Sequence, residues 1–152
     1  MKHTSRSLND TKNIAQAVLD GLPSFLAEKK CGNVATVLGL YGDLGSGKTA
    51  FTQAIAGLFG VKEGITSPTF VIEKIYELSP SYTQAYQHVI HIDAYRLEHA
   101  SELTRLGWSS LLKDPSNIIL IEWPEKVAEI MPENHFKIHF TFIDEATREI
   151  EF

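Results

Sequence analysis

The residues that point most directly to a chemistry lie between positions 42 and 49, where the sequence reads GDLGSGKT. This segment fits the pattern G-x-x-x-x-G-K-[ST], in which a glycine-rich backbone surrounds phosphate oxygens with its N–H groups. The three glycines allow the chain to fold closely around an anion without clashes from Cβ atoms. We expect Lys48 to place its charge beside the β and γ phosphates, and Thr49 to offer a hydroxyl to Mg²⁺.

The segments on either side favour this interpretation over a chance match. Residues 34–41, VATVLGLY, form an apolar run typical of a strand, and residues 50–60 are predicted to form an amphipathic helix that ends at Gly60. A phosphate loop joins a strand to a helix in this way, and the helix N-terminus adds a partial positive charge. The predicted nucleotide contacts in this loop are Asp43, Leu44, Gly45, Ser46, Gly47, Lys48 and Thr49.

A phosphate-loop enzyme needs a second magnesium anchor, which is an acid at the end of a neighbouring strand. Glu122 ends the uninterrupted apolar run IILIE and is the first choice for the metal, with Thr49 as the other metal ligand. Asp93 ends the more polar segment HVIHID and is predicted to orient the attacking water or to hold waters around Mg²⁺. Lys48, Asp93 and Glu122 are therefore the candidate catalytic residues. The alternative for each acid is a solvated carboxylate at the end of a strand.

Three further features carry weaker signals. Thr69, in Ser67-Pro68-Thr69, lies where a GTPase switch segment would carry a hydroxyl to Mg²⁺, although a plain turn fits equally well. Trp123 is a packing residue by default, but its place directly after Glu122 also puts it at the mouth of the site. His88 and His91 lie three apart on a predicted strand, so they point to opposite faces and do not easily share one ion. His135 and His139 could share a face but lack a third ligand, which favours surface or packing roles over a transition-metal site.

Length and composition indicate one α/β domain spanning residues 1–152. A helix is predicted from about Asn9 to Lys29, capped at Asn9 or Asp10 and kinked or broken near Gly21 and Pro23. Extended segments at 69–77, 86–95 and 118–123, a helix at 99–114 and a final hairpin around 144–146 complete the pattern. Strands that alternate with helices predict an α/β fold with a mixed sheet.

The composition also restricts where the protein acts and on what. The net charge is −5 and no more than two basic residues are adjacent, so the chain lacks the basic stripe of a direct nucleic-acid binder. The single cysteine, the absence of a long apolar run and an N-terminus without an apolar stretch predict a cytoplasmic protein with no signal peptide and no membrane segment.

Several nucleotide-using classes fit less well. The guanine-reading pattern N-K-x-D and the transporter signature LSGGQ are both absent from the sequence. A small-molecule or nucleotide kinase remains the alternative, although its usual arginine-rich lid is not evident because the four arginines are scattered. A nucleotide-gated binding module that barely hydrolyses ATP is a second rival.

Four segments in order, YGDLGSGKT, SPTF, HIDAYRL and IEWPEK, resemble the TsaE (YjeE) family, the P-loop ATPases of bacterial tRNA threonylcarbamoyladenosine biosynthesis. The resemblance covers roughly residues 7–150 and is specific because the four motifs occur together. This chain departs from the family pattern at Ala94, where a leucine or another apolar residue is common, and at Trp108. It implies a three-layer P-loop NTPase-like sandwich with a mixed, largely parallel sheet and a C-terminal hairpin.

The resemblance also implies how such a site works. Mg-ATP would bind at residues 43–49, with Thr49 and Glu122 as magnesium ligands and Asp93 important for hydrolysis. Trp123 would lie near the nucleotide, while Thr11 and Arg148 would wall the adenine. The family works with the TsaD–TsaB transferase pair, which handles the tRNA, and its weak hydrolysis rises when this partner binds. The oligomeric state cannot be predicted from these residues.

Overall fold

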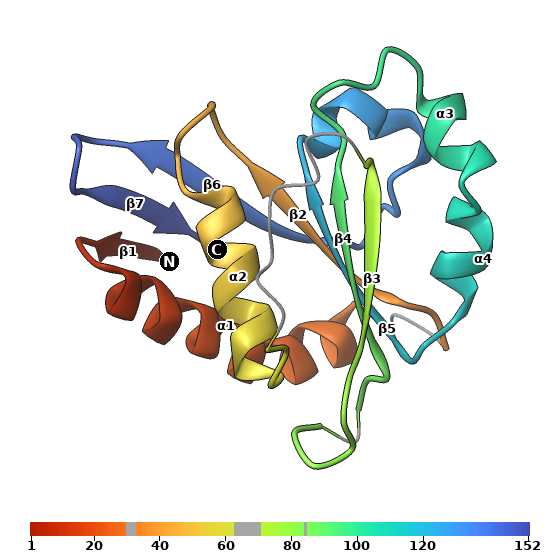
Figure 1. Ribbon diagram of the computed structural model, residues 1–152, viewed down its shortest axis with the longest axis horizontal. Helices are drawn as coiled ribbons and strands as arrows, with labels where there is room; N and C mark the ends of the chain where they lie inside the picture. The colour runs from red at the N-terminus through yellow and green to blue at the C-terminus, as the bar shows by residue number, and fades with distance from the viewer. Residues whose placement is uncertain (30–32, 63–70, 84) are drawn as a thin grey trace.

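The computed structural model describes residues 1–29, 33–62, 71–83 and 85–152, which form an α/β fold around one seven-stranded sheet (Figure 1). The strand order is β1-β7-β6-β2-β5-β4-β3. The strands are β1 (Lys2–Ser5), β2 (Thr36–Tyr41), β3 (Glu73–Glu77), β4 (His88–Asp93), β5 (Asn117–Glu122), β6 (Phe136–Phe142) and β7 (Arg148–Glu151). Parallel pairs join β6, β2, β5 and β4, and antiparallel pairs add β3 at one edge and β7 and β1 at the other. The predicted mixed sheet with a C-terminal hairpin is confirmed.

Helices cover both faces of the sheet, which gives the predicted three layers (Figure 1). The helices α1 (Leu8–Glu28) and α2 (Lys48–Leu58) pack on one face, and α3 (Ala100–Arg105), α4 (Trp108–Lys113) and the 3₁₀ helix η1 (Pro124–Ile130) pack on the other. All six residues of β5 are buried, because the central strand has helices on both sides. Within the described residues, none of the helices has the combination of length and apolar character needed to cross a bilayer.

Three local predictions were wrong. Helix α1 begins after Ser7, whose side chain accepts from the Asp10 backbone N–H, and the helix continues unbroken through Pro23. Its buried side chains Ile14, Val18 and Leu22 pack against the core, and this burial stabilises the helix by more than Pro23 destabilises it. The helix predicted at 99–114 is two helices separated at Gly107, which has a φ of 91°.

Strand β1 was not predicted from the sequence. Its residues Lys2–Ser5 pair antiparallel with β7, so the two ends of the chain lie side by side at one edge of the sheet (Figure 1). Lys2 also forms an ion pair with Glu149 over 2.8 Å. Strand β1 forms because it pairs with residues more than 140 positions away along the chain.

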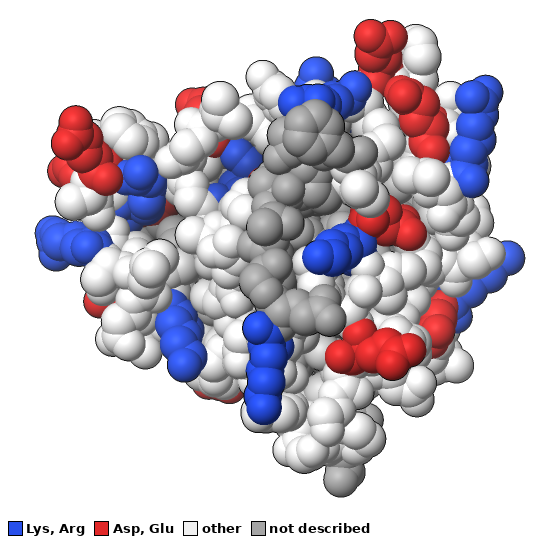
Figure 2. Space-filling model, viewed as in Figure 1, with Lys and Arg blue, Asp and Glu red and all other residues white. Residues whose placement is uncertain are grey.

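Charged side chains are distributed over the surface rather than gathered. On the face shown in Figure 2, Lys and Arg are interspersed with Asp and Glu, and no extended basic patch covers this face among the described residues. This distribution agrees with the net charge of −5.

Candidate functional site

The glycine-rich loop lies at the carboxyl end of the buried strand β2 and leads directly into α2. Gly42, Gly45 and Gly47 have positive φ angles of 145°, 75° and 102°, which residues with a Cβ rarely adopt. A Cβ atom on Gly42 would lie 2.4 Å from the backbone oxygen of Phe140. Helix α2 begins at Lys48, so its first N–H groups face the loop. The predicted strand–loop–helix context is confirmed.

Lys48 lies across this loop and is almost completely buried. Its Nζ donates hydrogen bonds to the carbonyl oxygens of Gly42 and Asp43, and it lies 4.2 Å from the centre of the Trp123 ring. Burial lowers the pKa of Lys48, and the nearby carboxylates, Glu122 first among them, act in the opposite direction. The amine is therefore held in a fixed place where an anion in the loop would meet a positive charge.

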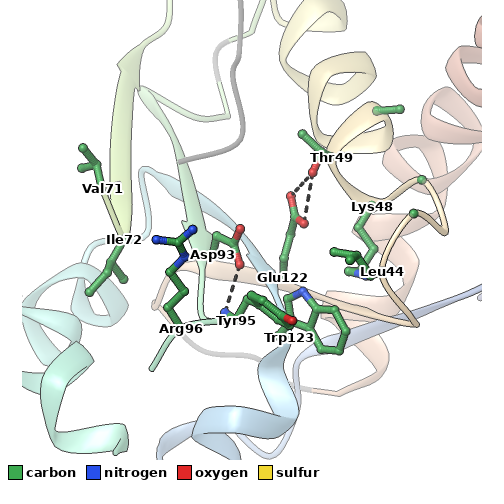
Figure 3. A pocket seen from close by; sticks show the side chains of 13 residues that line it. Leu44, Lys48, Thr49, Val71, Ile72, Asp93, Tyr95, Arg96, Glu122 and Trp123 are labelled. Atoms are coloured by element: carbon green, nitrogen blue, oxygen red, sulfur yellow. Dashed lines mark hydrogen bonds between the residues drawn. The ribbon is translucent and has the colours of Figure 1, made fainter. Parts of the chain in front are cut away.

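Glu122 and Thr49 meet where β5 ends beside the start of α2 (Figure 3). The Thr49 hydroxyl donates to both carboxylate oxygens of Glu122, at 3.0 and 3.2 Å. Adjacent oxygen ligands of Mg²⁺, each about 2.0–2.1 Å from the ion, are themselves about 2.9 Å apart in an octahedron. The two side chains are hard oxygen donors at this spacing, so the pair fits a magnesium site.

Asp93 lies opposite Glu122 in the register between the parallel strands β4 and β5. One of its carboxylate oxygens accepts the Tyr95 backbone N–H over 3.0 Å. Because the carboxyl ends of parallel strands meet at one edge of the sheet, Asp93 and Glu122 line the same cavity. The structure thus brings together the two acids that the sequence singled out.

A cavity of about 670 Å³ opens between the phosphate loop and the ends of β4 and β5. From the loop and the start of α2 it is lined by Leu44, Gly45, Gly47, Lys48 and Thr49. The ends of β4 and β5 contribute Asp93, Glu122 and Trp123. Its size is in the range of small-molecule and cofactor sites. Most of the predicted site residues therefore face one shared space.

Trp123 has the only positive φ angle, 59°, among the non-glycine residues that the structure describes. Such a conformation costs on the order of 1–3 kcal/mol and persists only where the surroundings impose it. The strained backbone directs the indole into the cavity, where it lies over Lys48 and 5.0 Å from the ring of Tyr95. Trp123 therefore lines the cavity and also packs against the apolar core on the α3, α4 and η1 side of the sheet.

The other predicted contacts that the structure describes do not line this cavity. Ser46 is a fully buried residue of the loop, and the Asp43 carbonyl accepts hydrogen bonds from both Lys48 Nζ and the Ser46 backbone N–H. The Thr11 hydroxyl lies 2.8 Å from that of Ser5, near the start of α1. Thr69 falls outside the described residues.

Arg148 touches the phosphate loop but does not line the cavity. Its Nε donates to the Gly45 carbonyl oxygen over 3.1 Å, and its Nη1 bonds to the carbonyl oxygens of Asp144 and Thr147. The guanidinium also packs 4.5 Å from the centre of the Phe142 ring. Arg148 therefore joins the C-terminal hairpin to the loop, and its contact with adenine stays a prediction.

Sequence reasoning missed several residues at the site. Arg96 and Tyr95 line the cavity from the segment after β4, and Val71 and Ile72 line it from the segment before β3 (Figure 3). Arg96, Tyr95 and His91 all belong to the HIDAYRL segment of the family resemblance, which was the signal that could have found them, but only Asp93 of that segment was assigned a role. His91 was also missed, although its Nε2 lies 2.8 Å from Glu122 Oε1.

The histidines predicted to be surface or packing residues have separate environments. His135 and His139 both stack against the ring of Tyr41, with ring centres 6.0 and 4.9 Å away. His88 contacts the Asn117 side chain over 3.0 Å, whereas His91 faces Glu122. Among the described residues, no group of three or more His, Cys, Asp or Glu side chains has the arrangement of a metal site.

Residues 5–150 match a protein family described as "Threonylcarbamoyl adenosine biosynthesis protein TsaE". A Bacillus subtilis protein named tRNA threonylcarbamoyladenosine biosynthesis protein TsaE is 34% identical over 76% of this chain and 68% of its own length. The Nostoc sp. protein of the same name is 31% identical over 91% of this chain and 90% of its own. Among solved structures, the crystal structure of Bacillus subtilis YdiB superposes with a TM-score of 0.65 at 27% identity, covering 99% of this chain and 82% of that one.

Proposed function

The chain belongs to the TsaE family, whose members take part in tRNA threonylcarbamoyladenosine biosynthesis, and from this premise we propose that it is a magnesium-dependent ATPase that supports that pathway. One observation carries the proposal. Lys48, Thr49 and Glu122 line a single cavity at the phosphate loop, with the Thr49 hydroxyl 3.0 Å from the Glu122 carboxylate. A cationic amine and a hydroxyl–carboxylate pair are the groups that Mg-ATP requires.

In this proposal the loop binds the phosphates and α2 supplies its N-terminal N–H groups to them. Lys48 Nζ would exchange its hydrogen bonds to the two carbonyl oxygens for hydrogen bonds to phosphate oxygens, which are stronger because the phosphates are negatively charged. Thr49 and Glu122 would hold Mg²⁺, which would neutralise charge that develops on the phosphates. These residues together would position the terminal phosphate of ATP in the cavity.

Asp93 has the second catalytic role. Its carboxylate faces the same cavity from β4, opposite Glu122 in the strand register. From there it orients a water molecule toward the terminal phosphate by accepting a hydrogen bond from it. Trp123 covers Lys48 from the mouth of the cavity and limits the access of other water molecules.

The partner in this proposal is the TsaD–TsaB transferase pair, which would hold the tRNA. The chain itself carries a net charge of −5, and the described face of Figure 2 has no extended basic patch. A direct tRNA binder would carry such a patch. The ATPase therefore acts on the transferase rather than on the nucleic acid, and this role places it in the cytoplasm.

Arg96 bears on how the partner would activate hydrolysis. In other phosphate-loop enzymes a partner protein can supply an arginine that stabilises the charge of the transition state. Arg96 lines the cavity together with Lys48, so the chain contributes one arginine of its own. The partner would then activate hydrolysis by repositioning the residues around this cavity. It could do so in addition to supplying an arginine or without supplying one.

Direct binding tests the nucleotide site. Titration calorimetry with ATP and Mg²⁺ should show binding by the wild-type chain and a loss of about tenfold to a hundredfold in Lys48→Ala, since hydrogen bonds to charged groups contribute about 1.5–3 kcal/mol. Lys126→Ala, which removes an exposed lysine from η1, is the matched control and should bind as the wild type does. Equal affinity in Lys48→Ala and the wild type would contradict the proposal.

A further inference from the structure

The imidazole of His91 is completely buried in β4, on the face of the sheet that packs against α1 and α2. Val89 precedes it on the same face and belongs to the apolar core there. The Nε2 atom of His91 lies 2.8 Å from Glu122 Oε1, and Nδ1 has no hydrogen-bond partner among the described residues. Burying a polar ring in an apolar core costs free energy, which the hydrogen bond to Glu122 offsets.

The register of the sheet explains how the two residues meet. In the parallel pair of β4 and β5, His91 lies opposite Leu120 and Asp93 lies opposite Glu122. Leu120 and Glu122 are two residues apart on β5, so their side chains point to the same face of the sheet as His91. His91 is therefore a diagonal neighbour of Glu122 and lies within reach of its carboxylate. His88 lies three positions earlier on the strand and contacts the Asn117 side chain instead.

The contact with Glu122 fixes the direction of the hydrogen bond. A carboxylate accepts hydrogen bonds but does not donate them, so Nε2 of His91 carries the proton. Oε1 of Glu122 then accepts from His91 at 2.8 Å and from Thr49 at 3.0 Å, whereas Oε2 accepts from Thr49 at 3.2 Å. With donors from two different elements, the carboxylate plane is held in one orientation.

We propose that His91 is a positioning residue for the divalent cation: its buried Nε2–H donor holds the Glu122 carboxylate in the orientation in which it and Thr49 bind the ion. The inference rests on the proposed magnesium role of Glu122 and extends it to a residue that does not itself touch the ion. A glutamate side chain has several rotatable bonds, and a donor behind it keeps them in the orientation required for metal binding. This explains why a histidine occupies a position next to apolar core residues.

The test uses substitutions that keep or remove the donor. In His91→Gln the side-chain amide places an N–H near the position of Nε2, whereas the shorter side chain in His91→Asn ends near Nδ1 and does not reach Glu122. His91→Leu removes the donor but keeps the core filled. His88→Gln and His88→Leu are the matched controls on the same strand.

The readout is binding of a fluorescent ATP analogue to each variant, first without divalent ions and then as Mg²⁺ is added. The measured quantity is the magnesium concentration that produces half of the full change in analogue binding. We expect this concentration to rise about tenfold or more in His91→Asn and His91→Leu, as for other residues that hold a metal ligand in place. We expect His91→Gln and both His88 variants to stay near the wild type. Binding without Mg²⁺ should be unchanged in every variant, which also shows that each one is folded.

Three results would overturn the inference. Wild-type magnesium dependence in folded His91→Asn or His91→Leu would show that the donor is not needed. A defect in His91→Gln as large as that in His91→Asn would show that the position of the N–H is not the cause, and this comparison holds even if the leucine variant does not fold. If the wild-type chain binds the analogue with no response to Mg²⁺, the proposed magnesium site fails first, and the role of His91 fails with it.

Discussion

The Nε atom of Arg148 donates a hydrogen bond to the carbonyl oxygen of Gly45 over 3.1 Å, so the first residue of β7 holds the middle of the phosphate loop. The same guanidinium bonds to carbonyl oxygens of the turn between β6 and β7. This contact connects the C-terminal hairpin to the residues that would surround the phosphates. It suggests a role for Arg148 different from the adenine contact that the family resemblance implies.

The two roles of Arg148 can be separated with two ligands. If Arg148 braces the loop, Arg148→Ala should weaken the binding of ATP and of inorganic triphosphate by the same factor, because both ligands use the loop. If Arg148 instead contacts adenine, only ATP binding should weaken. We expect equal losses of several-fold in titration calorimetry. Arg105→Ala, at an exposed position at the end of α3, is the control and should change neither affinity.

The geometry of the loop makes Gly42 intolerant of a side chain. Its φ is 145°, and a Cβ would lie 2.4 Å from the backbone oxygen of Phe140, which cannot move without shifting β6. We expect Gly42→Ala to lower the free energy of unfolding by at least about 1–3 kcal/mol, the usual cost of such strain, and to weaken ATP binding.

A second glycine provides the control for this prediction. Gly21 lies within α1, and a Cβ there would meet nothing within 4 Å. Gly21→Ala should therefore raise the free energy of unfolding by about 0.5–1 kcal/mol, because alanine loses less conformational freedom in a helix. Urea denaturation of both variants checks the opposite signs. A Gly42→Ala chain as stable as the wild type would contradict the loop geometry described above.

His135 should make the protein less stable in mild acid. Its Nδ1 donates to the Pro132 carbonyl and its Nε2 contacts the Tyr41 hydroxyl, each over 2.6 Å. Burial lowers the pKa of His135 below its ordinary value of 6.5. Between the lowered pKa and 6.5, the unfolded chain binds a proton that the folded chain does not. The contribution of His135 is therefore fully present above pH 6.5 and is lost as the pH falls through the folded pKa.

Thermal unfolding between pH 7.5 and pH 5 checks this sign. In His135→Asn, whose amide can still donate to the Pro132 carbonyl, the melting temperature should fall less with acid than in the wild type. His139→Asn changes an exposed histidine beside the same Tyr41 ring and should keep the wild-type slope. Equal slopes in wild type and His135→Asn would show that this histidine does not take part.

The parts of the site that could be predicted from the sequence are those fixed locally. The loop follows from its glycines and from the strand and helix around it. Glu122 follows from its place at the end of an apolar strand, because parallel strands bring their carboxyl ends to one edge of the sheet. Asp93 follows by the same argument, and the register places it directly opposite Glu122.

The parts that could not be predicted depend on contacts between distant segments. Strand β1 exists because it pairs with β7, and four polar residues at the start of a chain give no periodic signal for such a pairing. His91 points toward Glu122 only once the register of β4 on β5 is known, although alternation along HVIHID already places it on the same face as Asp93. Arg96 reaches the cavity through the path of an irregular segment, and although it belongs to the HIDAYRL motif, no periodic pattern predicts where its side chain lies.

The central claim is that Lys48 and Glu122 make this chain an ATPase that its partner activates. The most direct measurement is phosphate release from ATP by the purified chain, alone and with the TsaD–TsaB pair, for the wild type, Lys48→Ala, Glu122→Ala and the exposed control Glu129→Ala. We predict a low rate alone, a higher rate with the pair, collapse in the two site variants and wild-type behaviour in Glu129→Ala. If the pair leaves the rate unchanged, or if phosphate passes to an added small-molecule acceptor instead of water, the account is contradicted and the kinase alternative takes its place.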